Sequence, residues 1–592
     1  MPRLSTAGHL LRDDMIGIGD GKIAMTSNKR IVGISVVLGF LTLALNACAE
    51  KNTNSYPDRW VYVARNLTKD QYIEEIQEIA ETARQHGLNG MLFAAGLEDV
   101  GQWKEDRLAR LEKVKAICKA NQIEIIPIIW SVGYGSCLGI NKNLAEGLPC
   151  EDVPFIVKGK EARLAPDADV KIVNGGFEEF EKNRMKGYAF HDKPGEVSFP
   201  DTNVFHSVKA SLRFENFGKY EHGHARFMQN LSVKPHRQYR ISCWVKTETI
   251  EPVNAFTIQV YGPKECIAPV SFDIPATTDW REVSLVFNSL QYNNLNLYAG
   301  LWGGKSGMIW FDDLRIEELA LVNVLRRPGT PVTLKSVDGR TFYEEGRDYE
   351  RIEDSKLSFW CPRPDNPPIK LAAQSRINDG ERLLVKYYHG MAINNGQVTV
   401  CMSEPELYKH WRASAAAIKE HLNPDKWFLS MDEIRAGGSC AACKVRQMSM
   451  GEILGDCITK QVQIIRDVNP KAKVYIWSDM LDPKHNAHGD YYLVDGDFTG
   501  SWEHVPKDLI MCCWHFKIRD ESMRFFSALG FETLAGAYYD ADDLENIKGW
   551  IETCNHTPKC RGIMYTSWRN KYKLLPDFGD AVVKAARPMG GQ

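Results

Sequence analysis

The sequence predicts an α/β fold in which a (β/α)8 TIM barrel is interrupted after strand three by an all-β jelly-roll sandwich. Strand-like and helix-like segments alternate near both ends of the chain, and short alternating strands fill the region between them. The length of 592 residues suits one barrel with an accessory module. Hydrophobic residues make up 44% and charged residues 25%, which excludes a disordered chain, a collagen and a polytopic membrane protein.

The charges are nearly balanced, with 73 Lys and Arg against 76 Asp and Glu and a formal net charge of -3. Because there is no basic excess, we expect no nucleic-acid partner. Aromatic residues make up 10% of the chain, including 15 Trp and 22 Tyr. Such rings can serve as flat platforms for sugars, although large cores use them too.

Residues 1–48 are interpreted as a leader and a lipoprotein-type signal peptide. Lys29 and Arg30 precede an apolar stretch over 31–45, which is too short to favour a membrane-spanning helix. The stretch ends in Leu-Asn-Ala-Cys, which resembles a bacterial lipobox and makes Cys48 the predicted lipidation site. The alternative is a plain secretory signal with a chance cysteine. Both interpretations predict export, and the first predicts membrane contact only through a lipid anchor, in the periplasm or at the cell surface.

The first part of the barrel is predicted over residues 57–160. Segments 60–65, 90–95 and 123–130 have the composition of short buried strands. Segments 72–86 and 108–120 carry apolar residues at helical spacing, and the first of them ends before Gly87. This order of strands and helices favours a parallel sheet covered by helices.

Residues 171–320 are predicted to form the inserted sandwich, with strands at 238–247, 255–261, 282–287, 296–301 and 308–316. Segments 173–178 and 309–315 resemble the opening and closing strands of carbohydrate-binding modules of family 4/9. The resemblance implies glycan binding and a structural calcium, for which Glu178 and Asp312 are the matching oxygen donors. The alternative is a structural insertion that binds no ligand.

Residues 321–372 are turn-rich and are predicted to form a β-rich connector, and the second part of the barrel is predicted over 373–588. Strands are expected at 427–431, 474–477, 509–514, 534–538 and 562–565, and a helix at 404–422. Three strands before the insertion and five after it give the eight of a closed barrel. A further strand at 382–388 is left out of this count, because including it would give nine.

In a barrel of this kind the active site lies at the carboxyl ends of the strands. Polar and aromatic residues lie at or just after the ends of six of the predicted strands: Arg65, Asp432, Glu433, Trp477, Asp479, Trp514, Tyr538, Tyr539, Asp540 and Trp568. A barrel needs apolar residues in its interior and nothing special at its mouth. The pattern therefore indicates a functional site.

These strand ends resemble those of glycoside hydrolase family 20, the β-N-acetylhexosaminidases. Asp432 and Glu433 stand where that family carries its catalytic dyad. The resemblance also implies sugar-binding roles around the dyad, with an arginine for the hydroxyls and an aromatic box: Arg65, Trp477, Trp514, Tyr538 and Trp568. The family usually has two glycines before the dyad, where this chain has Ser430 and Met431, and a small α/β domain before the barrel, which this sequence does not show.

The resemblance implies substrate-assisted, retaining hydrolysis of an oligo- or polysaccharide, and with it a role in polysaccharide degradation. A glycosidic oxygen must be protonated as its bond breaks, so Glu433 is the predicted acid. The 2-acetamido oxygen of the substrate attacks, Asp432 orients it, and Tyr538 or Tyr539 donates a hydrogen bond to it. Hydrolysis needs only water and carboxylates, so no organic cofactor is expected.

Two other hypotheses stay open. Asp479, Glu503 and Asp540 are further carboxylates near the predicted rim, and one of them opposite Glu433 would give a two-carboxylate glycosidase acting on a non-acetylated or sulfated hexose glycan. The chain can also be a non-catalytic surface lipoprotein that binds glycans. A separate alternative concerns the acidic pair itself, which would cap the following segment and pair with Arg435.

The 15 cysteines are scattered, and Cys440 and Cys443 form the only CxxC motif. A zinc site normally needs a second pair of ligands. Cys457, His485 and His488 follow the motif, but not at a zinc-ribbon spacing. We therefore expect a disulfide or free thiols here rather than a metal.

Overall fold

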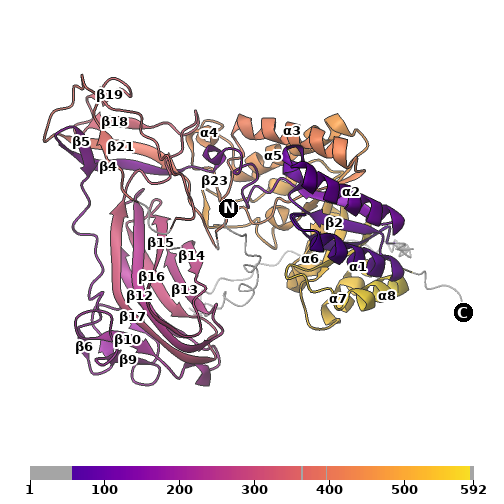
Figure 1. The fold of residues 1–592 in the computed structure, drawn as a ribbon, viewed down its shortest axis with the longest axis horizontal. Helices are drawn as coiled ribbons and strands as arrows, with labels where there is room; N and C mark the ends of the chain where they lie inside the picture. The colour runs from indigo at the N-terminus through magenta and orange to yellow at the C-terminus, as the bar shows by residue number, and fades with distance from the viewer. Residues whose placement is uncertain (1–55, 264, 362–364, 395, 587–592) are drawn as a thin grey trace, which may run out of the picture.

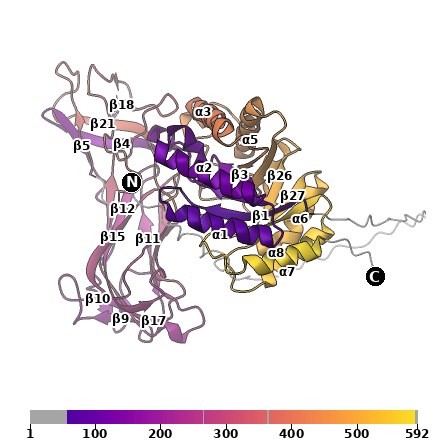
Figure 2. The ribbon, with the colours of Figure 1, turned by 45° about the vertical axis from the view of Figure 1, so that its right-hand side comes forward.

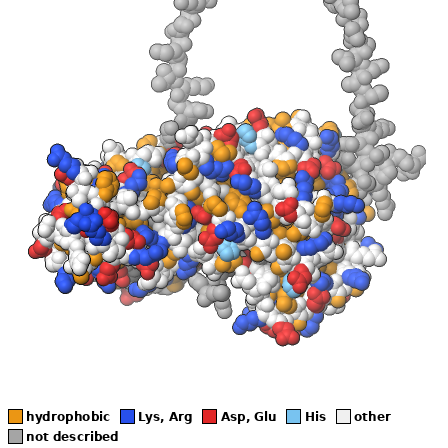
Figure 3. Space-filling model, turned by 90° about the horizontal axis from the view of Figure 1, so that it is seen from above, with side chains coloured by type: hydrophobic (Ala, Val, Ile, Leu, Met, Phe, Trp, Pro, Cys, Tyr) orange, Lys and Arg blue, Asp and Glu red, His pale blue; other side chains and the backbone are white. Residues whose placement is uncertain are grey.

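The computed structural model describes residues 56–263, 265–361, 365–394 and 396–586. A barrel covered by helices lies beside a region made almost entirely of strands (Figure 1). The predicted signal peptide and Cys48 lie outside the described residues. Positive and negative side chains are interspersed over the face seen from above (Figure 3).

The barrel is a closed ring of eight parallel strands. Its first and last strands, β1 and β28, pair with each other and close the ring. In order around the ring, the strands are β1 (Asp58–Ala64), β2 (Gly90–Ala94), β3 (Glu124–Ile129), β22 (Lys426–Leu429), β24 (Lys473–Trp477), β26 (Ile510–Cys513), β27 (Glu532–Tyr538) and β28 (Cys560–Thr566).

Helices cover the outside of this ring (Figure 2). They are α1 (Gln71–Gln85), α2 (Glu105–Ala120), α3 (Pro405–His421), α5 (Met450–Val468), α6 (Arg519–Ala528), α7 (Glu545–His556) and α8 (Leu575–Ala585). Helix α5 shows why such a segment is helical. Ser449 and Glu452 form a capping box at its start, and an apolar face that includes Ile453 and Leu454 is buried.

The barrel interior is filled by side chains, so it is a packed core rather than a channel. At its amino-terminal end the buried carboxylate of Asp58 accepts a hydrogen bond from the hydroxyl of Tyr475 and forms ion pairs with Lys426 and Arg561. At the opposite end the interior rings of Tyr62, Trp477 and Trp568 pack together. The amino-terminal end is therefore closed by ion pairs, and the candidate site lies at the carboxyl end.

The segment between β3 and β22 forms two further bodies of antiparallel strands. The first is a sandwich of two five-stranded sheets, in the orders β15-β12-β17-β10-β9 and β14-β13-β16-β11-β8. Its strands are β8 (Phe190–His191), β9 (Ser198–Asp201), β10 (Ser211–Phe214), β11 (Ala225–Ser232), β12 (Gln238–Glu251), β13 (Phe256–Tyr261), β14 (Cys266–Ser271), β15 (Thr278–Asn288), β16 (Asn294–Leu301) and β17 (Ser306–Leu319).

The second body is a six-stranded sheet in the order β19-β18-β21-β4-β5-β20. Its strands come from both sides of the sandwich in sequence: β4 (Leu148–Lys158), β5 (Glu161–Leu164), β18 (Thr333–Ser336), β19 (Phe342–Tyr343), β20 (Ile369–Lys370) and β21 (Arg382–His389). Strand β21 pairs antiparallel with β4. The additional strand expected at 382–388 thus belongs to this sheet and not to the barrel.

The predicted fold class, an α/β barrel interrupted by one sandwich, is wrong for the chain as a whole. The described residues form 28 strands but only eight α-helices, and just eight of the strands belong to the parallel barrel. The fold is therefore mixed and mostly β. The prediction failed because the six-stranded sheet joins strands more than 200 residues apart, a pairing that local patterns do not reveal.

None of the helices among the described residues combines the length and apolar character needed to cross a membrane.

Candidate active site

The predicted acidic pair lies at the carboxyl end of the barrel, just after β22. The backbone N–H of Ser430 still bonds to the carbonyl of Ile129 at the end of β3, at 2.8 Å, so the chain leaves the barrel only after this residue. Asp432 is buried, and Glu433 adopts a left-handed backbone with φ of 49°. This turn brings the main chain against Gly133, whose Cβ, if present, would lie 2.5 Å from the carbonyl oxygen of Asp432.

A third carboxylate, that of Asp479, joins the pair from the end of β24. One of its oxygens accepts the backbone N–H of Glu433 at 3.0 Å and the side-chain amide of Asn486 at 2.9 Å. Its other oxygen accepts the indole N–H of Trp514 at 3.4 Å. Asp479 is completely buried.

Burial raises the pKa values of both aspartates, Asp432 and Asp479. Desolvation, followed by the charges of Asp479 and Glu433, raises the pKa of Asp432 to about 8. Desolvation and the charge of Glu433 raise the pKa of Asp479 to about 7. The two groups interact, so they titrate as a pair, and their raised pKa values favour the protonated forms up to about neutral pH.

Glu433 has the opposite environment. Arg435 forms a two-point ion pair with it, at 2.8 Å to one oxygen and 3.1 Å to the other. The hydroxyl of Tyr134 donates to the same carboxylate, and the amide of Gln397 donates to it at 3.4 Å. A buried guanidinium and two further donors favour the ionised form of this carboxylate.

Aromatic rings form a wall beside the carboxylates. Trp514 and Tyr539 stack almost parallel, with ring centres 5.8 Å apart and planes 6° apart. Trp568 packs against Tyr539 at 6.3 Å and against Trp477 at 5.9 Å. Because Trp514 also donates to Asp479, the wall and the carboxylates form one continuous site.

Three other residues predicted for the site have different surroundings. Tyr538 stacks on Tyr565 at 4.1 Å, and Tyr565 packs on Phe578 of α8, so this ring belongs to the layer between barrel and helices. Asp540 accepts the backbone N–H of Trp568 at 2.9 Å, and it therefore positions that ring. Arg65 donates to Glu75 of α1 at 2.5 Å.

Sequence reasoning missed two residues that contact Glu433. Tyr134 belongs to the loop after β3 and contacts Glu433 from there. It stands between Gly133 and Gly135, and these two glycines were the one feature of the sequence that could have drawn attention to it. Gln397 comes from the segment after β21, and nothing in the sequence links it to the barrel. His485 packs on Trp514 at 4.6 Å, and burial lowers its pKa to about 3, so it is neutral.

The two residues proposed as calcium ligands hold a loop of the sandwich. Glu178 accepts the backbone N–H of Lys209 at 3.2 Å. Asp312 accepts the backbone N–H groups of His206 at 2.7 Å and Ser207 at 3.0 Å. A calcium ion at these residues stays a prediction.

No protein-family model matches the chain, and no curated protein matches it. Among solved structures, a carbohydrate-binding module described as CBM4 shares 15% identity over 25% of this chain and 99% of its own, with a TM-score of 0.18. The CBM22-1 xylan-binding domain from Paenibacillus barcinonensis shares 15% identity over 26% and 96%, with a TM-score of 0.19. The β-N-acetylhexosaminidase from Bacteroides fragilis shares 12% identity over 33% and 42%, with a TM-score of 0.25. These scores are low, so the assignment of function depends on the side chains of the site.

Proposed function

We propose that the chain is a glycoside hydrolase whose active site contains Asp432, Glu433 and Asp479. One observation carries the proposal: the carboxyl groups of Asp432 and Asp479 are buried beside Glu433, and Glu433 is ion-paired with Arg435. Burial raises the pKa values of the two aspartates, and the ion pair favours the charged form of the glutamate. Glycoside hydrolysis needs both states, a proton for the leaving oxygen and a negative charge against the oxocarbenium ion. The adjoining rings suit the apolar faces of a sugar.

In this proposal Asp432 donates the proton and Glu433 supplies the negative charge. Sequence reasoning alone assigns the proton to Glu433. The ion pair with Arg435 supports the reverse, because a cation at this distance favours the carboxylate form. Asp432, with its pKa raised to about 8, still carries a proton at neutral pH and can pass it to the glycosidic oxygen.

For the substrate we propose a β-linked N-acetylhexosaminide in an oligo- or polysaccharide. The stacked rings of Trp514 and Tyr539 and the edge of Trp568 offer an apolar wall for an acetamido methyl group. The acetamido oxygen would attack the anomeric carbon as the bond to the protonated leaving oxygen breaks, and the charge of Glu433 would stabilise the positively charged oxazolinium ring that forms. Water would then attack the anomeric carbon, open that ring and give a proton back to Asp432. The product would keep the configuration of the substrate.

A two-carboxylate mechanism is the second candidate, and the charge on Glu433 favours it. An ionised carboxylate beside a protonated one can act as nucleophile or as base without help from the substrate. The substrate would then be a non-acetylated or sulfated hexose glycan.

The test compares hydrolysis of 4-nitrophenyl N-acetyl-β-glucosaminide with hydrolysis of its 2-hydroxy counterpart. We expect turnover of the N-acetyl compound by the wild type, at least a 10²-fold loss in Asp432→Asn, and little change in Asp467→Asn, an exposed residue of α5. Cleavage of only the 2-hydroxy compound would leave the two-carboxylate enzyme. Glycan binding without turnover in every protein would leave the binding lipoprotein.

Export and lipidation at Cys48 are part of the same proposal, and they depend on residues 1–48 alone. The sandwich would hold the polymer near the barrel. Mass spectrometry of the membrane fraction tests the anchor, because acylation at Cys48 adds the mass of fatty acyl chains to the first peptide.

A further inference from the structure

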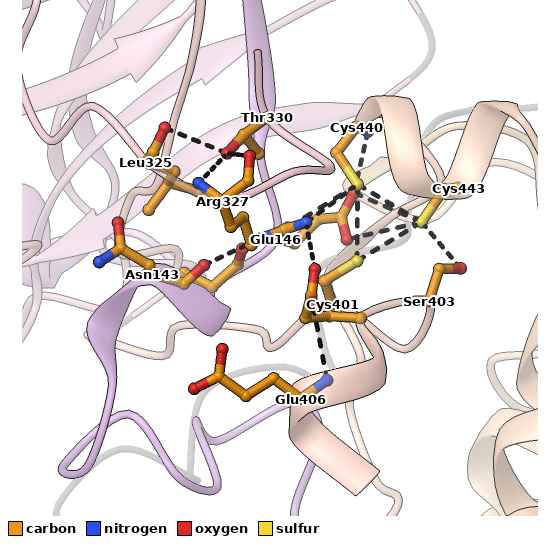
Figure 4. Close-up of polar contacts among 12 residues, drawn as sticks. Asn143, Glu146, Leu325, Arg327, Thr330, Cys401, Ser403, Glu406, Cys440 and Cys443 are labelled. Carbon is orange, nitrogen blue, oxygen red and sulfur yellow. Dashed lines mark hydrogen bonds and ion pairs between the residues drawn. The ribbon is translucent and has the colours of Figure 1, made fainter. Parts of the chain in front are cut away.

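Three cysteines and one glutamate converge outside the barrel rim. They are Glu146, Cys401, Cys440 and Cys443, all four of which are buried, and their nearest ligand atoms lie within 4.8 Å of one another. Figure 4 shows the three sulfurs and the carboxylate pointing toward one centre. The sequence brought only the CxxC pair to attention, whereas the fold adds one thiol and one carboxylate.

These four residues come from three separate segments that hydrogen-bond to one another. Glu146 lies just before β4, Cys401 lies just before α3, and the CxxC pair begins the short helix α4 (Ala441–Lys444). The backbone N–H of Cys401 bonds to the carbonyl of Leu144 at 2.8 Å, and the N–H of Glu146 bonds to the carbonyl of Thr399 at 2.8 Å. The carboxylate of Glu146 also accepts the backbone N–H of Cys440 at 3.2 Å.

The three sulfur–sulfur distances and the distance from Glu146 to Cys443 match a tetrahedron around zinc. The sulfur of Cys401 lies 3.5 Å from that of Cys440 and 3.7 Å from that of Cys443, and the last two lie 3.7 Å apart. Four ligands with Zn–S bonds of ~2.3 Å put neighbouring sulfurs ~3.8 Å apart. The carboxylate of Glu146 lies 3.8 Å from the sulfur of Cys443, where a zinc tetrahedron requires ~3.6 Å.

We propose that Glu146, Cys401, Cys440 and Cys443 bind one Zn²⁺ ion. Thiolates are soft ligands, and three of them with one carboxylate in a tetrahedron suit Zn²⁺ better than Mg²⁺ or Ca²⁺, which prefer six or more oxygens. Four protein ligands leave no position for a substrate, so the site is structural. A disulfide between two of the thiols would leave the third thiol and the carboxylate without a common partner.

A buried cation, Arg327, lies beside the cluster. The guanidinium of Arg327 lies 3.8 and 3.9 Å from the sulfur of Cys440 and forms an ion pair with Glu404 at 3.2 Å. Three thiolates and a carboxylate carry four negative charges, of which Zn²⁺ neutralises two. Arg327 offsets part of the remainder and orients its ligand, as partners behind metal ligands commonly do.

The position of the cluster couples it to the barrel rim. Cys401 lies four residues after Gln397, and Cys440 lies five residues after Arg435, both of which contact Glu433. A zinc ion here would tie the segments that carry these two residues to the segment before β4. Its removal is therefore expected to loosen the surroundings of Glu433.

The metal content of the purified full-length chain tests this proposal without any assay of activity. We expect about one zinc ion per chain by elemental mass spectrometry, and a loss of at least 80% of it in Cys440→Ser and in Glu146→Gln. Cys118→Ala, which removes a buried thiol of α2, serves as the control and should keep the metal. Replacement of zinc by Co²⁺ should give the visible bands of a tetrahedral site and a thiolate-to-metal band in the near ultraviolet.

Two results would overturn the proposal. One is wild-type protein that contains no zinc, takes up no Co²⁺ after reduction, and carries a disulfide between Cys440 and Cys443 by peptide mass mapping. The other is a Co²⁺ spectrum that stays unchanged in Cys440→Ser. The first result concerns the wild type alone, and a variant that folds poorly would lose the Co²⁺ spectrum rather than keep it, so poor folding cannot produce either result.

Discussion

The carboxylate of Asp479 accepts the backbone N–H of Glu433 at 3.0 Å. This bond ties the turn after β22 to the end of the neighbouring strand β24. It holds Glu433, which has a left-handed backbone, between the buried carboxyl groups of Asp432 and Asp479. The same carboxylate also accepts the indole N–H of Trp514, so it links Glu433 to the aromatic wall. Asp479 thus positions both groups.

Replacement of Asp432 by asparagine should stabilise the protein at alkaline pH. The pKa of Asp432 is about 8 in the folded chain and about 4 in an unfolded one, so the folded state binds more protons between these values and loses stability as pH rises. Asparagine mimics the protonated form. We expect Asp432→Asn to gain on the order of 1–2 kcal/mol in unfolding free energy over the wild type at about pH 8.5, and nothing at low pH.

Urea unfolding at two pH values measures this difference, and Asp467→Asn controls for a change of surface charge. An equal shift of Asp432→Asn at both pH values would show that its carboxyl group is not protonated in the folded state.

Replacement of Asp479 by asparagine should move the alkaline limb of the pH–rate profile. The charge of Asp479 is one of the causes that raise the pKa of Asp432, second only to burial. Without it, Asp432 loses its proton at lower pH, and activity should begin to fall below pH 8. The profile of kcat/KM against pH measures the shift. If the alkaline limb stayed at its wild-type position, the result would contradict the assignment of Asp432 as the proton donor.

The close approach of Gly133 to the acidic pair predicts a sensitive position. An added Cβ would lie 2.5 Å from the carbonyl oxygen of Asp432 and 2.7 Å from that of Glu433, so Gly133→Ala must displace the turn. We expect a fall in kcat of roughly 10- to 100-fold, because small displacements of reacting groups are costly. Gly139→Ala is the matched control, since nothing lies within 4 Å of its added Cβ. Equal activities of the two variants would contradict the arrangement of the turn.

The two adjacent tyrosines at the end of β27 should behave differently. Tyr539 stacks on Trp514 at the site, whereas Tyr538 stacks on Tyr565 beneath α8. We expect Tyr539→Phe to lower kcat/KM about 10-fold through loss of a hydroxyl contact to substrate, and Tyr538→Phe to leave it unchanged. Steady-state kinetics on one substrate distinguish the two, and the reverse order of effects would place the sugar elsewhere.

The sequence predicted the parts of the fold that depend on local patterns. Each barrel strand is a short apolar run, and the polar residues after β22 and β24 could be recognised because strand ends share one rim. The six-stranded sheet could not be predicted, since β4 and β21 meet only in the folded chain. For the same reason Gln397 was missed at the site, and Cys401 and Glu146 were missed beside the CxxC motif.

The most direct test of the central claim, that Asp432 gives a proton while Glu433 supplies charge, varies the leaving group. Asp432→Asn and Glu433→Gln are each assayed on an N-acetyl-β-glucosaminide with an aliphatic leaving group and on one with a 2,4-dinitrophenyl group, which departs without protonation. We expect Asp432→Asn to lose activity on the first substrate and to keep most of it on the second, and Glu433→Gln to lose both. The opposite pattern, with the dinitrophenyl compound rescuing only Glu433→Gln, would contradict the assignment.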